Sequence, residues 1–152
     1  MGCGWAKRGK RLRVPTTSQH RERLNVFGWV APLLGQQGLV RTPKGNRDGF
    51  LAVLANLYER LRGHTIWLYV DGASWHKGDQ IKEFLKTHVR LHLEYLPPYQ
   101  PALNMQERVW RTIRYEATTN RYFGSLELTW KTVQLTARHW SPQKIQRLCH
   151  IL

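Results

Sequence analysis

The stretch YLPPYQPALNMQERVW, residues 95–110, joins the last predicted strand of the chain to a helix. Its three prolines predict a stiff loop, because proline has a fixed φ and no backbone N–H to pair in a sheet. Asn104 and Glu107 follow with the N-x-x-E spacing of a capping box, and Glu107 precedes Arg111 by the four positions of a helical ion pair. Three roles for Glu107 are therefore open: helix cap, ion-pair partner, or catalytic metal ligand.

Outward from this stretch, the spacing of hydrophobic residues predicts a single α/β domain. The predicted strands are 24–31, 38–42, 64–70 and 90–96, and the predicted helices are 48–62, 79–88, 105–117, 125–139 and 142–150. A hairpin followed by strand–helix–strand units predicts a mixed sheet flanked by helices. Strand 64–70 is apolar on both faces, which predicts that it is covered on both sides.

Charge indicates a polyanionic partner. The 152 residues contain 24 Lys+Arg against 10 Asp+Glu, a formal net charge of +14. Nucleic acid is favoured over a membrane surface, because no apolar run is long enough to span a bilayer and no signal-peptide pattern occurs; the expected location is the cytoplasm. The basic N-terminal segment, 1–23, is either a solvated tail or a phosphate-binding arm. The candidate DNA-binding residues are Lys7, Arg8, Lys10, Arg11, Arg13, Arg108, Arg111 and Arg114.

The ten acidic residues are few enough to weigh singly. Asp48 and Asp79 precede predicted helices and are expected to cap them, while most others, Glu116 among them, lie on predicted polar faces. Asp71 differs, because it stands at the carboxyl end of the most apolar strand, where open α/β sheets place ligand sites. A turn aspartate in VDGAS is the structural alternative.

A catalytic role is better supported for Asp71 and Glu107 together than for either residue alone. They are 36 positions apart, and the helix, strand and loop between them can return the chain to the same end of the sheet. Two carboxylates brought together repel unless a cation or proton intervenes. Mg²⁺ is the economical cation, because it prefers oxygen ligands and retains water, and two such ions support phosphodiester displacement.

Two motifs carry a family resemblance. VDGASWHKG (70–78) followed by LPPYQPALNMQERVW (96–110) resembles the DDE transposases of mariner type, in the bacterial insertion-sequence branch. GWAKRGKR (4–11), RERLNVFGWV (21–30) and NRYF (120–123) are also similar, so the resemblance covers roughly residues 4–124.

The resemblance implies an RNase H-like fold and Mg²⁺- or Mn²⁺-dependent DNA strand cleavage and strand transfer by three carboxylates. It makes Asp71 the second carboxylate and Glu107 the third. His76 matches the family's histidine after the second aspartate, where it either supports the ligands or packs in the core, and Asn104 is the other residue expected beside them. The implied partners are transposon-end and target DNA, with a homodimer as a further expectation and a nucleoid-associated location.

The sequence also departs from the family pattern. Gln100, Ala102, Met105 and Gln106 replace the usual Ser, Glu, Pro and Ile, and no acid precedes Glu22. The family's first aspartate lies on a central strand upstream of the GWA segment. We therefore expect a partial catalytic domain over 24–124, with helices 125–152 packed on it, that lacks the first aspartate and its strand.

Without that strand, the strands at 24–31 and 64–70 lose a shared neighbour. Three explanations are open: an upstream partner polypeptide, a decayed or mis-started reading frame, or filling of the gap by the basic N-terminal segment. The chain alone is expected to be inactive. The alternative function is a non-catalytic, basic nucleic-acid-binding protein derived from a transposase.

Overall fold

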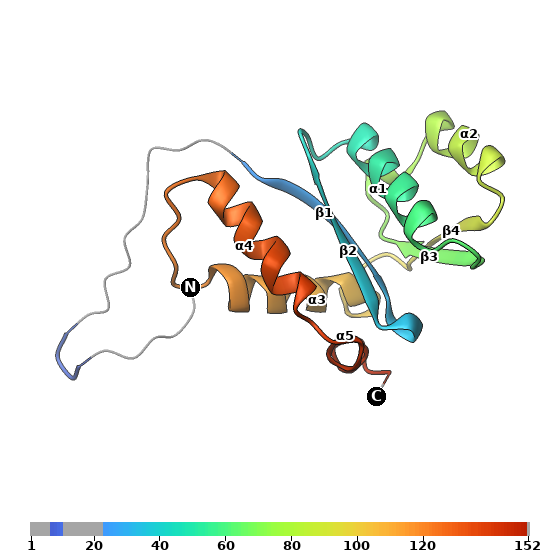
Figure 1. Ribbon diagram of the computed structural model, residues 1–152. Helices are drawn as coiled ribbons and strands as arrows, with labels where there is room; N and C mark the ends of the chain where they lie inside the picture. Colours follow the sequence, from blue (N-terminus) through green and yellow to red (C-terminus); the bar gives the residue numbers. More distant parts are fainter. Residues whose placement is uncertain (1–6, 11–22, 152) are drawn as a thin grey trace.

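The computed structural model describes residues 7–10 and 23–151 (Figure 1). Its strands are β1 (Asn25–Ala31), β2 (Gln36–Thr42), β3 (Ile66–Val70) and β4 (Leu91–Tyr95). Its α-helices are α1 (Arg47–Arg60), α2 (Asp79–Thr87), α3 (Met105–Ile113), α4 (Leu126–Arg138) and α5 (Pro142–Leu148). Short 3₁₀ turns are η1 (Pro32–Leu34), η2 (Ser74–His76) and η3 (Pro101–Leu103), and a π-turn, η4 (Arg114–Thr118), extends α3. The predicted elements and their order are confirmed.

The β1–β2 hairpin forms the middle layer of the molecule. Its strands are antiparallel, and Figure 1 shows α1 on one side of the hairpin and α3 and α4 on the other. Alternate residues of β1 point to opposite faces, so Trp29 packs with α1 while Val26 and Val30 pack with α3–α5. Gly28 faces α3, and a Cβ there would lie 2.4 Å from Nε2 of Gln106. Glycine at this position therefore permits close approach of the helix.

The second sheet is parallel and has one uncovered face. β3 and β4 pair from Ile66 with Leu91 to Val70 with Tyr95, and α2 makes the crossover between them. Ile66 and Val70 are buried, but Trp67 and Tyr69 on the opposite face are 58% and 60% exposed. The prediction that this strand is covered on both faces is therefore wrong, because α3–α5 pack on the hairpin instead.

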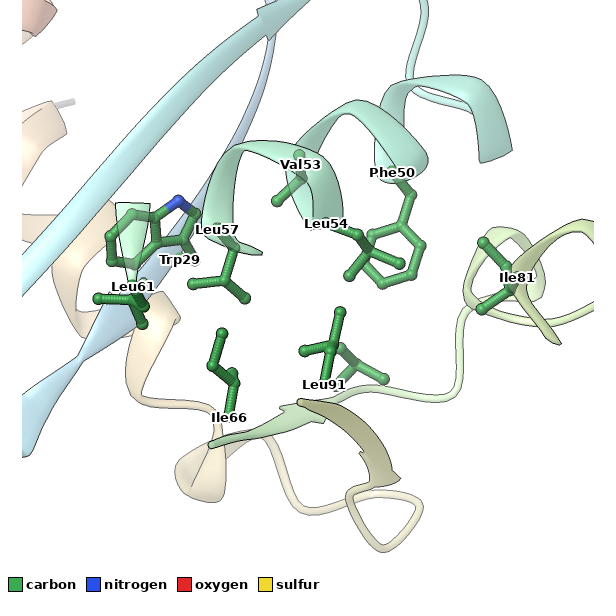
Figure 2. Packing of buried hydrophobic residues seen from close by; sticks show 10 residues of the cluster. Trp29, Phe50, Val53, Leu54, Leu57, Leu61, Ile66, Ile81 and Leu91 are labelled. Atoms are coloured by element: carbon green, nitrogen blue, oxygen red, sulfur yellow. The ribbon is translucent and has the colours of Figure 1, made fainter. Parts of the chain in front are cut away.

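Helix α1 connects the two sheets through one hydrophobic core. Figure 2 shows its side chains, including Leu54 and Leu57, between Trp29 of β1 and the residues Ile66 and Leu91 of the second sheet. Burial of this cluster places α1 across both sheets and fixes their separation. A second cluster lies on the far side of the hairpin, formed by α3, η4, α4 and α5.

Between the sheets, the strand ladder is interrupted. In the part of the chain that the structure describes, β1 pairs only with β2, and β3 pairs only with β4. This is the arrangement expected for an α/β domain without the strand shared by 24–31 and 64–70. The mixed α/β fold is therefore confirmed, and within the described residues no strand joins β1 to β3.

Two helix starts differ from the predictions. The N-cap of α1 is Asn46, whose side chain accepts a hydrogen bond from the backbone N–H of Gly49 at 3.1 Å, and Asp48 lies in the first turn. The N-cap of α2 is Gly78, with φ +118°, so Asp79 is already helical and pairs with Lys82. An N-cap residue needs non-helical backbone, and these two aspartates lie one or two positions too late. None of the helices within 7–10 and 23–151 is long and apolar enough to cross a membrane.

Candidate active site

Asp71 begins the loop directly after β3. The last ladder bond runs from the Leu96 N–H to the carbonyl of Val70 at 2.8 Å, so Asp71 emerges at the carboxyl end of the parallel pair. Its Oδ1 accepts a hydrogen bond from the backbone N–H of Ala73 at 3.2 Å and lies 3.0 Å from Nδ1 of His76. The Asp71 side chain is 59% exposed, so the carboxylate is oriented by the loop yet open to solvent.

His76 is buried and linked to Asp71 twice. Its Nδ1 lies 3.0 Å from the backbone carbonyl of Asp71 as well as 3.0 Å from Oδ1. Both neighbours are acceptors, so Nδ1 carries the proton. The ring packs on Phe50 at a centroid distance of 4.3 Å, and the hydroxyl of Tyr95 donates to the His76 carbonyl at 2.9 Å. His76 therefore packs in the core and lies against both the backbone carbonyl and the carboxylate of Asp71.

Glu107 lies in the first turn of α3. The N-cap is Asn104, whose Oδ1 accepts from the Gln106 N–H at 3.1 Å, while the Glu107 N–H donates to the Asn104 carbonyl at 3.1 Å. The side chain of Glu107 is exposed, and within the described chain its carboxylate has neither a hydrogen bond nor an ion pair, with Arg111 or any other residue. The two structural alternatives for Glu107 are therefore not realised. The helix N-terminus still favours negative charge at this position.

Asp71 and Glu107 line one cleft of about 290 Å³. The other residues around it are Gly72, Leu96, Pro97, Pro98, Tyr99, Gln100 and Asn104. Parallel strands end at the same edge of a sheet, so the loops after β3 and β4 meet, and the second loop leads into α3. The fold thereby brings together two carboxylates and an amide from residues 71–107. Sequence reasoning did not single out Tyr99, although an aromatic residue among prolines between two carboxylate motifs was an available signal.

The oxygen donors of this cleft suit a hard divalent cation. Mg²⁺ is commonly held by one or two carboxylates with water completing its shell, which matches Asp71 and the unpartnered Glu107. Among the described residues, no group of three or more His, Cys, Asp or Glu could hold a metal ion. Within the described residues, Asp71 and Glu107 are the carboxylates that line the cleft.

The candidate DNA-binding residues fall in different places. Arg111 and Arg114 are exposed, one and two turns along α3 and η4 from Glu107. Arg108 is half-buried, and its guanidinium acts on the thiol of Cys149. Burial raises the pKa of that thiol, and the positive charge of Arg108 partly offsets the rise. Lys7, Arg8 and Lys10 are exposed, whereas Arg11 and Arg13 lie outside the described residues.

An α/β fold with one carboxylate after a strand and a second at a helix start, both lining one cleft, offers oxygen ligands for a divalent metal ion. The chain matches the family described as DDE superfamily endonuclease over residues 2–129 and belongs to that family. It is 29% identical over 131 residues to the insertion element IS630 uncharacterized 39 kDa protein of Shigella sonnei, covering 83% of this chain and 37% of that protein. This chain therefore spans little more than a third of that relative.

A second protein sequence and one solved structure are also similar to this chain. The uncharacterized protein y4pE/y4sA of Sinorhizobium fredii (strain NBRC 101917 / NGR234) is 26% identical over 133 residues, covering 76% of this chain and 95% of that protein. Among solved structures, the Mos1 strand transfer complex is similar with a TM-score of 0.65 at 19% identity. That match covers 98% of this chain and 45% of the Mos1 chain, and it shows the fold.

Proposed function

We propose that this chain provides two catalytic carboxylates, Asp71 and Glu107, of a transposase that cleaves DNA and transfers the cut strand. The observation that supports the proposal best is that the two carboxylates line the same cleft, although they come from different elements 36 positions apart. The unpartnered state of Glu107 also supports it, because a carboxylate kept only for stability would be expected to have a protein partner. A relative encoded by an insertion element points to the same reaction class.

Each residue has a distinct proposed task. When bound, Mg²⁺ or Mn²⁺ would activate a water or 3′-hydroxyl and stabilise the leaving oxygen. Asp71 and Glu107 hold the ion, His76 orients Asp71 through its Nδ1–H, and Asn104 fixes the start of α3 by capping it. Arg111 and Arg114, with Lys7, Arg8, Lys10, Arg11 and Arg13 of the basic segment, contact DNA phosphates. Arg108 contributes less, since it is half-buried.

We further propose that a third carboxylate reaches the cleft on a strand from another polypeptide segment, encoded upstream. The separation of the described strands into two pairs supports this, because one added strand would satisfy the free backbone edges of both β1 and β3. The complete assembly would act on transposon ends and target DNA in the bacterial cytoplasm, associated with the nucleoid, as a homodimer.

The test is a nicking and strand-transfer assay on insertion-element-end DNA with Mg²⁺ or Mn²⁺. The chain is assayed alone and with an upstream segment carrying an aspartate on a strand. We expect cleavage only with both parts, and loss of cleavage in Asp71→Asn and Glu107→Gln. Glu83→Gln, which removes an exposed carboxylate on α2, is the matched control and should retain activity. Robust cleavage by the unassisted chain would contradict the need for a third carboxylate.

A non-catalytic nucleic-acid-binding role is the second candidate. The observation in its favour is that the described residues contain no cluster of three metal-binding side chains. It predicts strongly salt-dependent DNA binding that is indifferent to divalent metal and to both carboxylates. If Asp71→Asn and Glu107→Gln left every activity of the complemented protein intact, this role would replace the catalytic one.

A further inference from the structure

Tyr99 is the most exposed large side chain at the candidate site. It lines the cleft that contains Asp71 and Glu107, yet 99% of its surface is accessible to solvent. In the described chain its ring has no packing partner and its hydroxyl has no hydrogen bond. Burial in the fold therefore does not explain an aromatic residue at this position.

The backbone of Tyr99 is also unusual. Its φ is +60°, in the left-handed region that bulky residues rarely adopt. Such strain persists only where the surroundings enforce it, and it concentrates at functional sites. Glycine or asparagine would adopt this backbone with less strain, so tyrosine at this position carries a local cost.

The loop around Tyr99 is held at both ends. Pro97 and Pro98 restrict the backbone before it, and the Leu96 N–H bonds to the carbonyl of Val70 at 2.8 Å. After it, the Leu103 N–H bonds to the carbonyl of Gln100 at 3.1 Å. A ring presented from a stiff loop loses little conformational entropy when it binds a flat partner.

The surroundings of the ring select the kind of partner. The neighbouring groups are carboxylates suited to a metal-bound phosphodiester, and the chain carries a net charge of +14. A flat, exposed aromatic ring beside a phosphate-processing cleft is suited to stacking on a base, because every base has a π-face. A paired base shows its face only at a duplex end, so an unpaired base is the better ligand.

We propose that Tyr99 forms a nucleobase-binding subsite, in which its ring stacks on an unpaired base beside the cleft lined by Asp71 and Glu107. The proposal rests on the proposed function for its nucleic-acid partner. It adds a preference that the carboxylates alone do not give: tighter binding where the DNA strand is unpaired beside the cleft.

The test measures binding of fluorescent DNA in EDTA, so that the result does not depend on a bound metal ion or on cleavage. The probes are a duplex with a short single-stranded tail containing 2-aminopurine and a fully paired duplex of the same length. We expect the wild-type chain to prefer the tailed DNA and to quench 2-aminopurine fluorescence. Tyr99→Phe and Tyr99→Trp should behave like wild type, since both keep a stacking ring.

Tyr99→Asn removes the ring and keeps a residue that tolerates left-handed backbone. It should weaken binding of the tailed DNA roughly tenfold or more, abolish the quenching, leave binding of the paired duplex unchanged and not lower the melting temperature. Tyr115→Ala is the matched control, because Tyr115 is 71% exposed on η4 and does not line the cleft. It should bind both probes as wild type does.

Two results would overturn the subsite. One is wild-type affinity of Tyr99→Asn for the tailed DNA; the other is an equal loss for tailed and paired DNA, which would make Tyr99 a general contact. Failure of the carboxylate variants in the cleavage assay affects neither result. The subsite and the catalytic proposal can therefore fail separately.

Discussion

Replacement of His76 by phenylalanine separates the two roles that the structure gives this histidine. Phenylalanine keeps a ring against Phe50 and removes the Nδ1–H that bonds to the Asp71 carbonyl and lies near Oδ1 of Asp71. A hydrogen bond of this kind contributes about 0.5–1.5 kcal/mol, and water can replace it at a carboxylate that is 59% exposed. We therefore expect a loss of about 1 kcal/mol in the free energy of unfolding. Loss of the group that orients a metal ligand lowers metal affinity about 10- to 100-fold.

The assay is thermal unfolding with and without Mn²⁺. At a concentration ten times the wild-type Kd, Mn²⁺ should stabilise the wild-type chain by about 1.4 kcal/mol, and a tenfold weaker variant by only about 0.4 kcal/mol. His64→Phe is the control, because His64 is exposed in the loop before β3, where its ring Nδ1 lies 3.2 Å from the Arg62 carbonyl and away from Asp71 and Glu107 in the sequence. Stabilisation of His76→Phe equal to that of wild type would refute the orienting role, and no stabilisation of the wild type would show that Asp71 and Glu107 do not bind the ion without a third carboxylate.

The remaining predictions concern stability. Gln106→Met should raise the free energy of unfolding by about 1–3 kcal/mol, because the amide nitrogen and oxygen of Gln106 are both buried without a hydrogen-bond partner. Urea unfolding measures this change, and Gln100→Met, at an exposed position, is the control that should leave stability unchanged. Destabilisation by Gln106→Met would mean that the amide has a partner. Glu116→Ala should cost about 1–3 kcal/mol at pH 7, since it leaves the buried Trp140 indole N–H without an acceptor and removes the pair with Lys144. Burial raises the pKa of Glu116, but hydrogen bonds from Lys144 and Trp140 lower it more, so the folded value lies below the usual one. Its ionised form therefore stabilises the fold above the ordinary glutamate pKa, and this contribution is lost as pH falls through the lowered value. The difference between wild type and Glu116→Ala in urea unfolding should narrow at acid pH, and a constant difference would contradict the assignment.

Several features were open to prediction from sequence because they depend on nearby residues. Hydrophobic spacing located every strand and helix, and the prolines after β4 marked the loop that leads into α3. The position of Asp71 at a strand end and of Glu107 in a first helical turn followed from the same patterns. The predicted caps Asp48 and Asp79 are wrong, because Asn46 and Gly78 precede them and have the non-helical backbone of an N-cap.

Other features depend on contacts between distant segments. Glu116 was expected on a polar face, but α5 brings Lys144 to it and shields the pair from solvent. One face of β3, with Trp67 and Tyr69, is exposed because α3–α5 pack on the β1–β2 hairpin and not on this sheet. No local pattern reports which of two sheets a helix will cover, because both offer apolar surface.

The sequence by itself determined the order of elements, the family, and the two acidic residues worth testing, since periodicity and motif spacing are properties of the chain. Only the tertiary structure decided what those residues do in the fold. It left the Glu107 carboxylate without a partner, although its sequence spacing fits two stabilising roles, and it placed that carboxylate in one cleft with Asp71 and the strained Tyr99. The reason is physical: a side chain's partners are set by which surfaces pack together, and that packing is decided by burial across the whole domain.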